Sequence, residues 1–425
     1  MVEPKGLGWE RQWAQGVRDL GEMVKSAVRR LMLLVVLLPS AAHSWDRHRV
    51  LTEAALASEP GLDRMVKAET LQQYLTAIGK GTEKDFLTEQ KLNKNTEFRF
   101  EAGENAGSTI SIRNILIRYA DEPDWALDQD LFSQYPELWK DDYLYMGGSQ
   151  GYQSRAFRHL YFPQGYFRAP EPPSREPVPV DAPLGEAPDR ARIFFEQSRE
   201  AFAQGHPYWG ARFLAWALHY LEDMTMPFHT VQLPSLDFVR LKPDGSLDLE
   251  ATTRLVIYTH LAYDGYPGRA LEGEVGPEAE RRMRTALGAA APSAWNGPKE
   301  LSADAALRAA GLAPKAGAAA LAFFPPMTPA DAADPLGRVY NPAFWAEVRS
   351  RQTADPAGQA AFLEHLEKAI RPAGANIRAF TAAGLHPGAA GMDLEATVDR
   401  IFSETEKILK EIGAQNQTRR ESSGP

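Results

Sequence analysis

The feature that most constrains the fold of this chain is a helical repeat of apolar residues along much of its length. Apolar side chains recur at the 3.6-residue spacing that gathers them on one face of an α-helix. This spacing predicts helices over 50–57, 193–204, 211–222, 255–262, 360–369 and 394–412. Alternating strand patterns are scarce, so we expect an all-α fold.

Two stretches lack this repeat. Residues 163–188 contain eight prolines, and residues 286–337 are rich in alanine and proline. Proline is excluded from helix interiors because it lacks the backbone N–H. We therefore expect both stretches to be irregular insertions between helices of one multi-helix domain over 45–415. Residues 271–390 match no assigned pattern, and 416–425 are expected to form a disordered tail.

The N-terminal region has the layout of a secretory signal. An apolar run over 31–39 follows two arginines and leads into small residues that end at Ser44. The uncharged run from Leu31 to Ser44 has 14 residues, fewer than the roughly 20 that a membrane-spanning helix needs. We therefore predict a signal peptide over 1–44, a mature chain that begins at Trp45, and a secreted or periplasmic protein. An uncleaved N-terminal membrane anchor is the alternative.

Charge and cysteine content exclude several classes of function. The chain has 47 Lys and Arg against 56 Asp and Glu, a net charge of −9. Such a chain lacks the basic footprint of a protein that coats duplex nucleic acid. It has no cysteine, which excludes disulfides, thiolate metal sites and cysteine nucleophiles. Any metal ion must therefore be held by His, Asp, Glu or backbone groups.

Histidines paired with acidic residues are the candidates for chemistry. His219 and Asp223 are four residues apart, so on a helix they share one face. Pro227 stops that helix and allows His229 to fold back towards it. These three side chains are therefore expected to converge.

A second pair, His260 and Asp264, repeats the same spacing. Imidazole and carboxylate are the ligands that Zn²⁺ takes when thiolates are absent. One such pair alone is also typical of a surface ion pair or a helix cap, and His219 is compatible with a hydrogen-bonded core histidine. Two pairs together with His229 favour a metal centre with more than one ion.

These motifs resemble those of the zinc-dependent phospholipases C and the related single-strand-specific secreted nucleases, which share an all-α fold with three zinc ions. The segment from His219 to His229 is similar to the family's His-x-x-x-Asp-x-x-x-Pro-x-His core. The other similar features are His260-x-x-x-Asp264, His159-Leu-Tyr-Phe-Pro, and Trp45 followed by His48.

The resemblance implies three zinc sites. The implied ligand sets are Asp121, His159 and His219; His229, His260 and Asp264; and the α-amine and carbonyl of Trp45 with His48 and Asp223. Asp121 is chosen because Tyr119-Ala-Asp-Glu-Pro resembles the family's Ala-Asp segment, and Asp124 is the alternative.

The resemblance also implies a secreted zinc-dependent phosphodiesterase. Zinc ions in such sites lower the pKa of a shared water towards about 7 and hold the hydroxide in line with phosphorus, and Asp121 would orient or deprotonate that water. The His159 turn favours a phospholipase C that acts on phospholipid head groups at a membrane surface. Asp264 favours the alternative, a nuclease or nucleotidase for single-stranded nucleic acid. A non-catalytic helical envelope protein with a structural zinc site is the alternative from another class, and no protein partner is evident.

Aromatic residues near these motifs are candidates for a substrate wall that stacks a base or encloses a choline-like head group, or for ordinary core packing. They are Tyr119, Trp125, Phe157, Tyr161 and Phe162.

Overall fold

The computed structural model describes residues 47–135, 157–168, 178–246, 248–289 and 291–385. The chain divides into two units, one that ends at Gly384 and one that begins at Leu385, and every described residue but the last belongs to the first. The predicted leader over 1–44, the predicted helix over 394–412 and the predicted tail over 416–425 lie outside the described residues. Among the described residues, no helix combines the length and the apolar character needed to cross a membrane.

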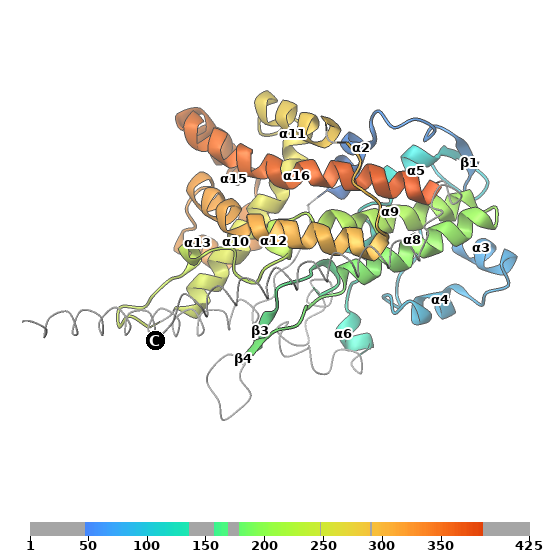
Figure 1. Ribbon diagram of the computed structural model, residues 1–425, viewed down its shortest axis with the longest axis horizontal. Helices are drawn as coiled ribbons and strands as arrows, with labels where there is room; N and C mark the ends of the chain where they lie inside the picture. The colour runs from blue at the N-terminus through green and yellow to red at the C-terminus, as the bar shows by residue number, and fades with distance from the viewer. Residues whose placement is uncertain (1–46, 136–156, 169–177, 247, 290, 386–425) are drawn as a thin grey trace, which may run out of the picture. The chain divides into compact units, whose positions relative to one another are not determined.

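The described residues form an all-α fold, as the apolar repeat predicts (Figure 1). The α-helices are α2 (His48–Leu56), α3 (Leu71–Ala77), α4 (Glu83–Glu89), α5 (Ile112–Arg118), α6 (Leu131–Gln134), α8 (Ala187–Ala203), α9 (Pro207–Asp223), α10 (Leu249–Leu271), α11 (Pro277–Ala289), α12 (Pro298–Phe323), α13 (Pro329–Ala333), α14 (Pro335–Tyr340), α15 (Pro342–Ala354) and α16 (Pro356–Leu385). Three shorter helices are η1 (Pro123–Leu127), η3 (Pro227–His229) and η4 (Leu236–Phe238).

Two short antiparallel ladders accompany the helices. Strand β1 (Met65–Lys67) pairs with β2 (Thr109–Ser111), with Val66 opposite Ile110. Strand β3 (Tyr166–Arg168) pairs with β4 (Val178–Val180), and both lie within 163–188. That stretch was predicted to be a loop without regular structure, and the β3–β4 pair is a difference from that prediction.

Helix α9 is the central element of the fold. Its sequence is apolar on nearly all sides, which is typical of a helix with no solvent-facing stripe. Every residue from Tyr208 to Asp223 is buried. Helix α8 packs along it, and Figure 1 shows the two lying side by side. α9 therefore offers a rigid support for the side chains near its C-terminal end.

Helix α12 corrects the prediction that 286–337 is irregular. It is a continuous helix from Pro298 to Phe323 that packs on α8. Its buried stripe consists mainly of alanine, which has the highest helix propensity and leaves room for a close neighbour. Pro298 lies in the first turn, where a proline is tolerated, whereas Pro314 lies inside the helix, which continues through it to Phe323.

Helix α16 is also longer than the predicted span of 360–369. The ring of Phe362 stacks on Phe323 of α12 at 4.3 Å between centroids, and Phe380 meets Phe195 of α8 at 4.7 Å. Residues 271–385 therefore add helices that pack against the elements predicted from the apolar repeat.

Candidate metal centre

The end of α9 carries two candidate ligands on one face. His219 Nε2 lies 3.6 Å from Asp223 Oδ2. The helix ends at Asp223, and η3 begins at Pro227. The chain turns back between them, so that His229 Nδ1 lies 3.3 Å from Asp223 Oδ1. The three side chains are buried and converge, as their spacing predicts.

Helix α10 brings the second predicted pair to His229. His260 Nε2 lies 3.0 Å from His229 Nε2. The ligand atoms of His229, His260 and Asp264 all lie within 4.8 Å of one another, and the three residues are buried. This group has the same members as the ligand set that the resemblance implies.

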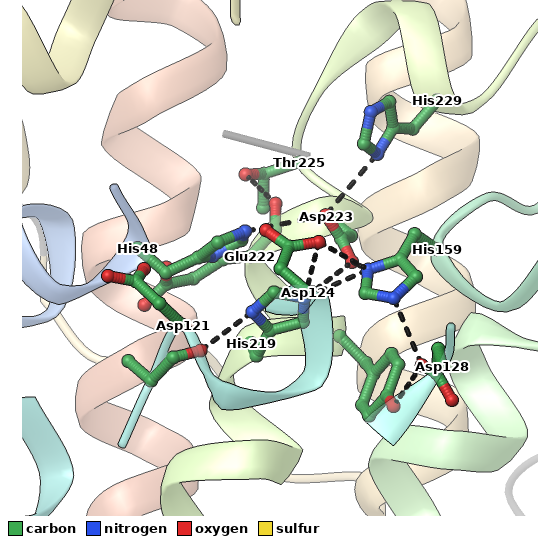
Figure 2. A network of polar contacts seen from close by, with 12 residues as sticks. His48, Asp121, Asp124, Asp128, His159, His219, Glu222, Asp223, Thr225 and His229 are labelled. Carbon is green, nitrogen blue, oxygen red and sulfur yellow. Dashed lines mark hydrogen bonds and ion pairs between the residues drawn. The ribbon is translucent and has the colours of Figure 1, made fainter. Parts of the chain in front are cut away.

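A second group joins α9 to two other parts of the chain. Figure 2 shows Asp124 and His159 meeting His219. His159 Nδ1 lies 2.8 Å from His219 Nε2 and 3.6 Å from Asp124 Oδ1. His219 Nε2 lies 3.8 Å from the same carboxylate oxygen. One ligand atom from each of these three residues lies within 4.8 Å of the others, close enough for all three to bind one cation.

The third group contains His48, the first residue of α2, with His219 and Asp223. His48 Nε2 lies 3.7 Å from Asp223 Oδ1, and the rings of His48 and His219 are 3.8 Å apart between centroids. The resemblance implies the same pairing of His48 with Asp223. Trp45, the other member of that implied set, lies outside the described residues.

Asp223 links the groups. Its two oxygens lie within 3.7 Å of nitrogen atoms on four histidines from separate parts of the chain. These are His48, His159, His219 and His229. The arrangement is therefore one continuous cluster around a single carboxylate rather than three isolated sites.

The structure differs from the predicted ligand sets at Asp121. Asp124, not Asp121, lies with His159 and His219. Pro123 begins the short helix η1, which carries Asp124 in its first turn and directs it to the histidines. Asp121 precedes this turn and lies beside α2, where its Oδ1 accepts a hydrogen bond from the main-chain N–H of Arg49 at 3.1 Å. Asp124, the alternative to Asp121 in the sequence analysis, therefore occupies the position of the carboxylate beside His159 and His219.

Hydrogen bonds on the outer side of the rings decide which nitrogens face the cluster. His219 Nδ1 donates to the main-chain oxygen of Ala120 at 2.7 Å, and His159 Nε2 donates to Asp128 Oδ2 at 3.0 Å. Because these oxygens accept, the outer nitrogens carry the hydrogens. The inner nitrogen of His219, Nε2, then offers a lone pair into the cluster, and that of His159, Nδ1, offers one when a cation displaces its proton. Such outer partners are typical of histidines that bind metals.

The electrostatics of the cluster favour a bound cation. Burial opposes ionisation of Asp223, but the surrounding imidazoles outweigh it and hold the pKa of Asp223 well below its usual range. Burial also opposes protonation of His159, yet the carboxylates of Asp223 and Asp128 raise its pKa to about 9. Burial and the neighbouring His48 hold the pKa of His219 well below its ordinary value. Without a bound ion, the cluster thus combines the ionised carboxylate of Asp223 with the neutral ring of His219 and a protonated His159, whose proton a cation would replace.

These donors fit a divalent cation. Nitrogen atoms of neutral histidines and oxygen atoms of ionised carboxylates are the ligands that Zn²⁺ and similar ions take in proteins. Two pairs of ring nitrogens face each other at 2.8 and 3.0 Å, at His219 with His159 and at His229 with His260. A shared cation satisfies both nitrogens of such a pair.

Two buried carboxylates of this region were missed by the sequence analysis. Asp128 accepts from His159 and from Tyr220 Oη at 2.5 Å. Glu222 contacts His48 Nδ1 at 2.7 Å and accepts from Thr52 Oγ1 at 2.7 Å. The available signal for Asp128 was its four-residue spacing from Asp124. Glu222 had no such signal in the sequence, because no helical spacing distinguishes it from its neighbour Asp223, the predicted ligand.

The predicted aromatic wall is mostly core. Tyr119, Phe157 and Phe162 are buried, and Tyr161 is half-buried. Trp125 is the exception, with 50% of its surface exposed directly after Asp124 in the chain.

No family model and no curated protein matches this sequence.

Proposed function

We propose that this protein is a secreted or periplasmic zinc-dependent phosphodiester hydrolase of the phospholipase C type. The observation that carries the proposal is the set of four histidines within 3.7 Å of Asp223. A structural zinc site is usually closed by four ligands around one ion. Here the donors form three groups, two of which share His219, and this number supports a centre with several ions. Such centres are typical of enzymes that cleave phosphodiesters.

Divalent cations bound there would polarise the phosphodiester and activate water for attack on phosphorus. The protein's own groups have to accept the proton of that water. The side chain of Asp124 is 13% exposed and faces His159 and His219, whereas Asp223 is fully buried. We therefore assign proton acceptance to Asp124 rather than to Asp121. The buried carboxylate of Asp223 would hold the histidines in place.

Phospholipid head groups at a membrane surface are our first candidate substrates, as the resemblance of the His159 turn implies. Single-stranded nucleic acid is the second candidate, favoured by Asp264 and by Trp125. Trp125 offers a half-exposed ring beside Asp124, on which a base can stack. The same ring also suits a lipid interface, where one side of an indole is apolar.

The deciding experiment compares the two substrates on the mature protein that begins at Trp45. Zinc-loaded and chelator-treated samples are assayed with phosphatidylcholine vesicles and with single-stranded DNA. Release of phosphocholine supports the phospholipase, and release of nucleotides supports the nuclease. Neither activity, together with one zinc ion or none, would favour the structural alternative. His260→Ala should lose the activity, because it removes a member of one group, and His365→Ala is its matched control, because His365 lies on α16 outside the three groups.

A further inference from the structure

A fully buried ion pair joins the turn that carries Asp124 to helix α9. The carboxylate of Glu122 accepts from Arg212 Nε at 2.9 Å and also from the terminal guanidinium nitrogen of the same side chain. Trp216 Nε1 donates to the same carboxylate at 2.7 Å. Both charged side chains are 0% exposed. None of these three residues belongs to the groups that can hold a metal ion.

The ion pair acts on the same face of α9 as the candidate ligands. Arg212, Trp216, His219 and Asp223 follow one another at spacings of four, three and four, which place them along one stripe of the helix. The turn is attached to this stripe twice. Glu122 is bound by Arg212 and Trp216, and the main-chain oxygen of Ala120 is bound by His219.

The guanidinium is itself held in place from the other side. Its centre lies 4.0 Å from the ring centroid of Tyr119 and 4.8 Å from that of Trp209, and one nitrogen donates to the main-chain oxygen of Arg99 at 3.1 Å. A guanidinium that donates from two nitrogens to one carboxylate fixes the direction of that carboxylate as well as its distance. The position of Glu122 along α9 is therefore closely determined.

A contribution to stability does not explain this pair. The cost of removing two charges from water offsets most of their attraction, and apolar replacements of similar volume are often as stable. What an apolar pair cannot supply is a directional bond that fixes the register of one segment on another. Asp124 follows Glu122 by two residues, so the register of Glu122 also sets the location of the Asp124 carboxylate.

We propose that Glu122 and Arg212 are positioning residues that set the cation affinity of the group formed by Asp124, His159 and His219. They make no contact with His229, His260 or Asp264 in the described hydrogen bonds and ion pairs, so we expect them to affect the affinity of that group far less. The inference rests on the proposed function only in that both groups bind a divalent cation.

The test is a titration of the full-length, metal-free protein with Zn²⁺, and with Co²⁺ for its visible spectrum. Two variants are compared with the wild type, Glu122→Gln and the double variant Glu122→Leu with Arg212→Met. The first keeps the shape of the side chain and an acceptor for Trp216, and the second removes both charges together. Asp264→Asn identifies the signal of the group formed by His229, His260 and Asp264. Glu367→Gln is the control, because it breaks an ion pair with Arg282 between α11 and α16 that touches neither group.

We expect both variants to weaken one class of Zn²⁺ site by about 10- to 100-fold, the range typical for residues that orient metal ligands. The site assigned through Asp264→Asn should keep its affinity and its Co²⁺ spectrum, and every site should stay unchanged in Glu367→Gln. The helical circular dichroism of the metal-free variants should match that of the wild type.

Several results would overturn the proposal. Unchanged affinity, or equal weakening of both sites, would show that the pair does not position Asp124. Wild-type affinity in the double variant, with weakening in Glu122→Gln alone, would show that the directional bond is not needed and that the loss comes from leaving the buried Arg212 cation without its charged partner. Loss of helical signal in both variants would make the pair structural. Failure of the wild type to bind either ion would defeat the proposed function as well, which separates the two failures.

Discussion

His219 donates its Nδ1 hydrogen to the main-chain oxygen of Ala120 at 2.7 Å, a contact between residues 99 positions apart in the chain. A carbonyl oxygen only accepts, so this bond leaves the Nε2 lone pair directed into the cluster. Burial lowers the pKa of His219 well below its ordinary value, so the ring stays neutral near pH 7. His219 can therefore bind a cation without first losing a proton.

Removal of metal should destabilise the protein measurably. We expect three bound zinc ions, and each site held at 100 times its dissociation constant would stabilise the folded state by about 2.7 kcal/mol. A chelator should therefore lower the unfolding temperature in calorimetry, and added Zn²⁺ should restore it. Metal analysis of protein purified without chelator gives the stoichiometry. A value of one or zero would contradict the multinuclear centre.

Asp124→Asn should impair the protein far more than Asp121→Asn. The amide keeps the shape of the carboxylate but is a poorer ligand and no base, and Asp124 is the carboxylate that lies with His159 and His219. We expect at least about a 100-fold loss of phosphodiester hydrolysis at Asp124, more than a residue that only orients a ligand would cause. The resemblance alone predicts the larger loss of hydrolysis for Asp121→Asn. A larger loss at Asp121 would restore that residue as the catalytic base.

Asp128→Asn should weaken Zn²⁺ binding by about 10- to 100-fold, because it disturbs the acceptor that orients His159. Competition with a chromophoric chelator measures the affinity. Asp130→Asn is a matched control on the same segment. Asp130 has a left-handed backbone that asparagine tolerates, and its side chain caps no helix. Equal effects of the two substitutions would mean that Asp128 does not act through His159.

Trp125→Ala should change activity with little effect on stability. The side chain is half exposed, and a substitution of this kind usually shifts the free energy of unfolding by no more than about 0.5 kcal/mol. Loss of a stacked base costs about 1–3 kcal/mol, or roughly 5- to 150-fold in affinity for single-stranded DNA. Binding and activity assays on both substrates measure the change. A large fall in unfolding temperature would instead place the ring in the core.

An extra residue before Trp45 should weaken the site that contains His48. An α-amine binds zinc only as a free terminus, because a peptide nitrogen has its lone pair delocalised. Trp45 is three residues from His48, at most about 11 Å along an extended chain. We expect protein that begins with Met-Trp45 to bind one ion less than protein that begins with Trp45, with the same helical content. Equal zinc content and activity would remove Trp45 from the ligands.

The local part of the candidate site could be predicted because helical spacing reports it directly. His219 and Asp223 share a face in any regular helix, Pro227 ends that helix, and His260 with Asp264 repeats the pattern. The same rule predicted the positions of α2, α8 and α9. These features depend on residues within one or two turns, and the sequence alone carries that information.

Contacts between distant segments needed the packed structure. Asp121 and Asp124 are equally plausible by composition, and only the helical turn at Pro123 directs the second towards His159. Glu122 pairs with a side chain 90 residues away, and no spacing indicates that partner.

Helix α12 makes the same point for the fold. Its alanines and prolines predicted an irregular stretch, yet the alanines form a continuous buried stripe in a helix packed on α8. Alanines produce only a weak apolar periodicity in the sequence. A helix built from them is stabilised by the close approach of a neighbouring helix. Apolar periodicity in the sequence predicts which face of a helix is buried. The packing of the whole domain determines which other element covers that face.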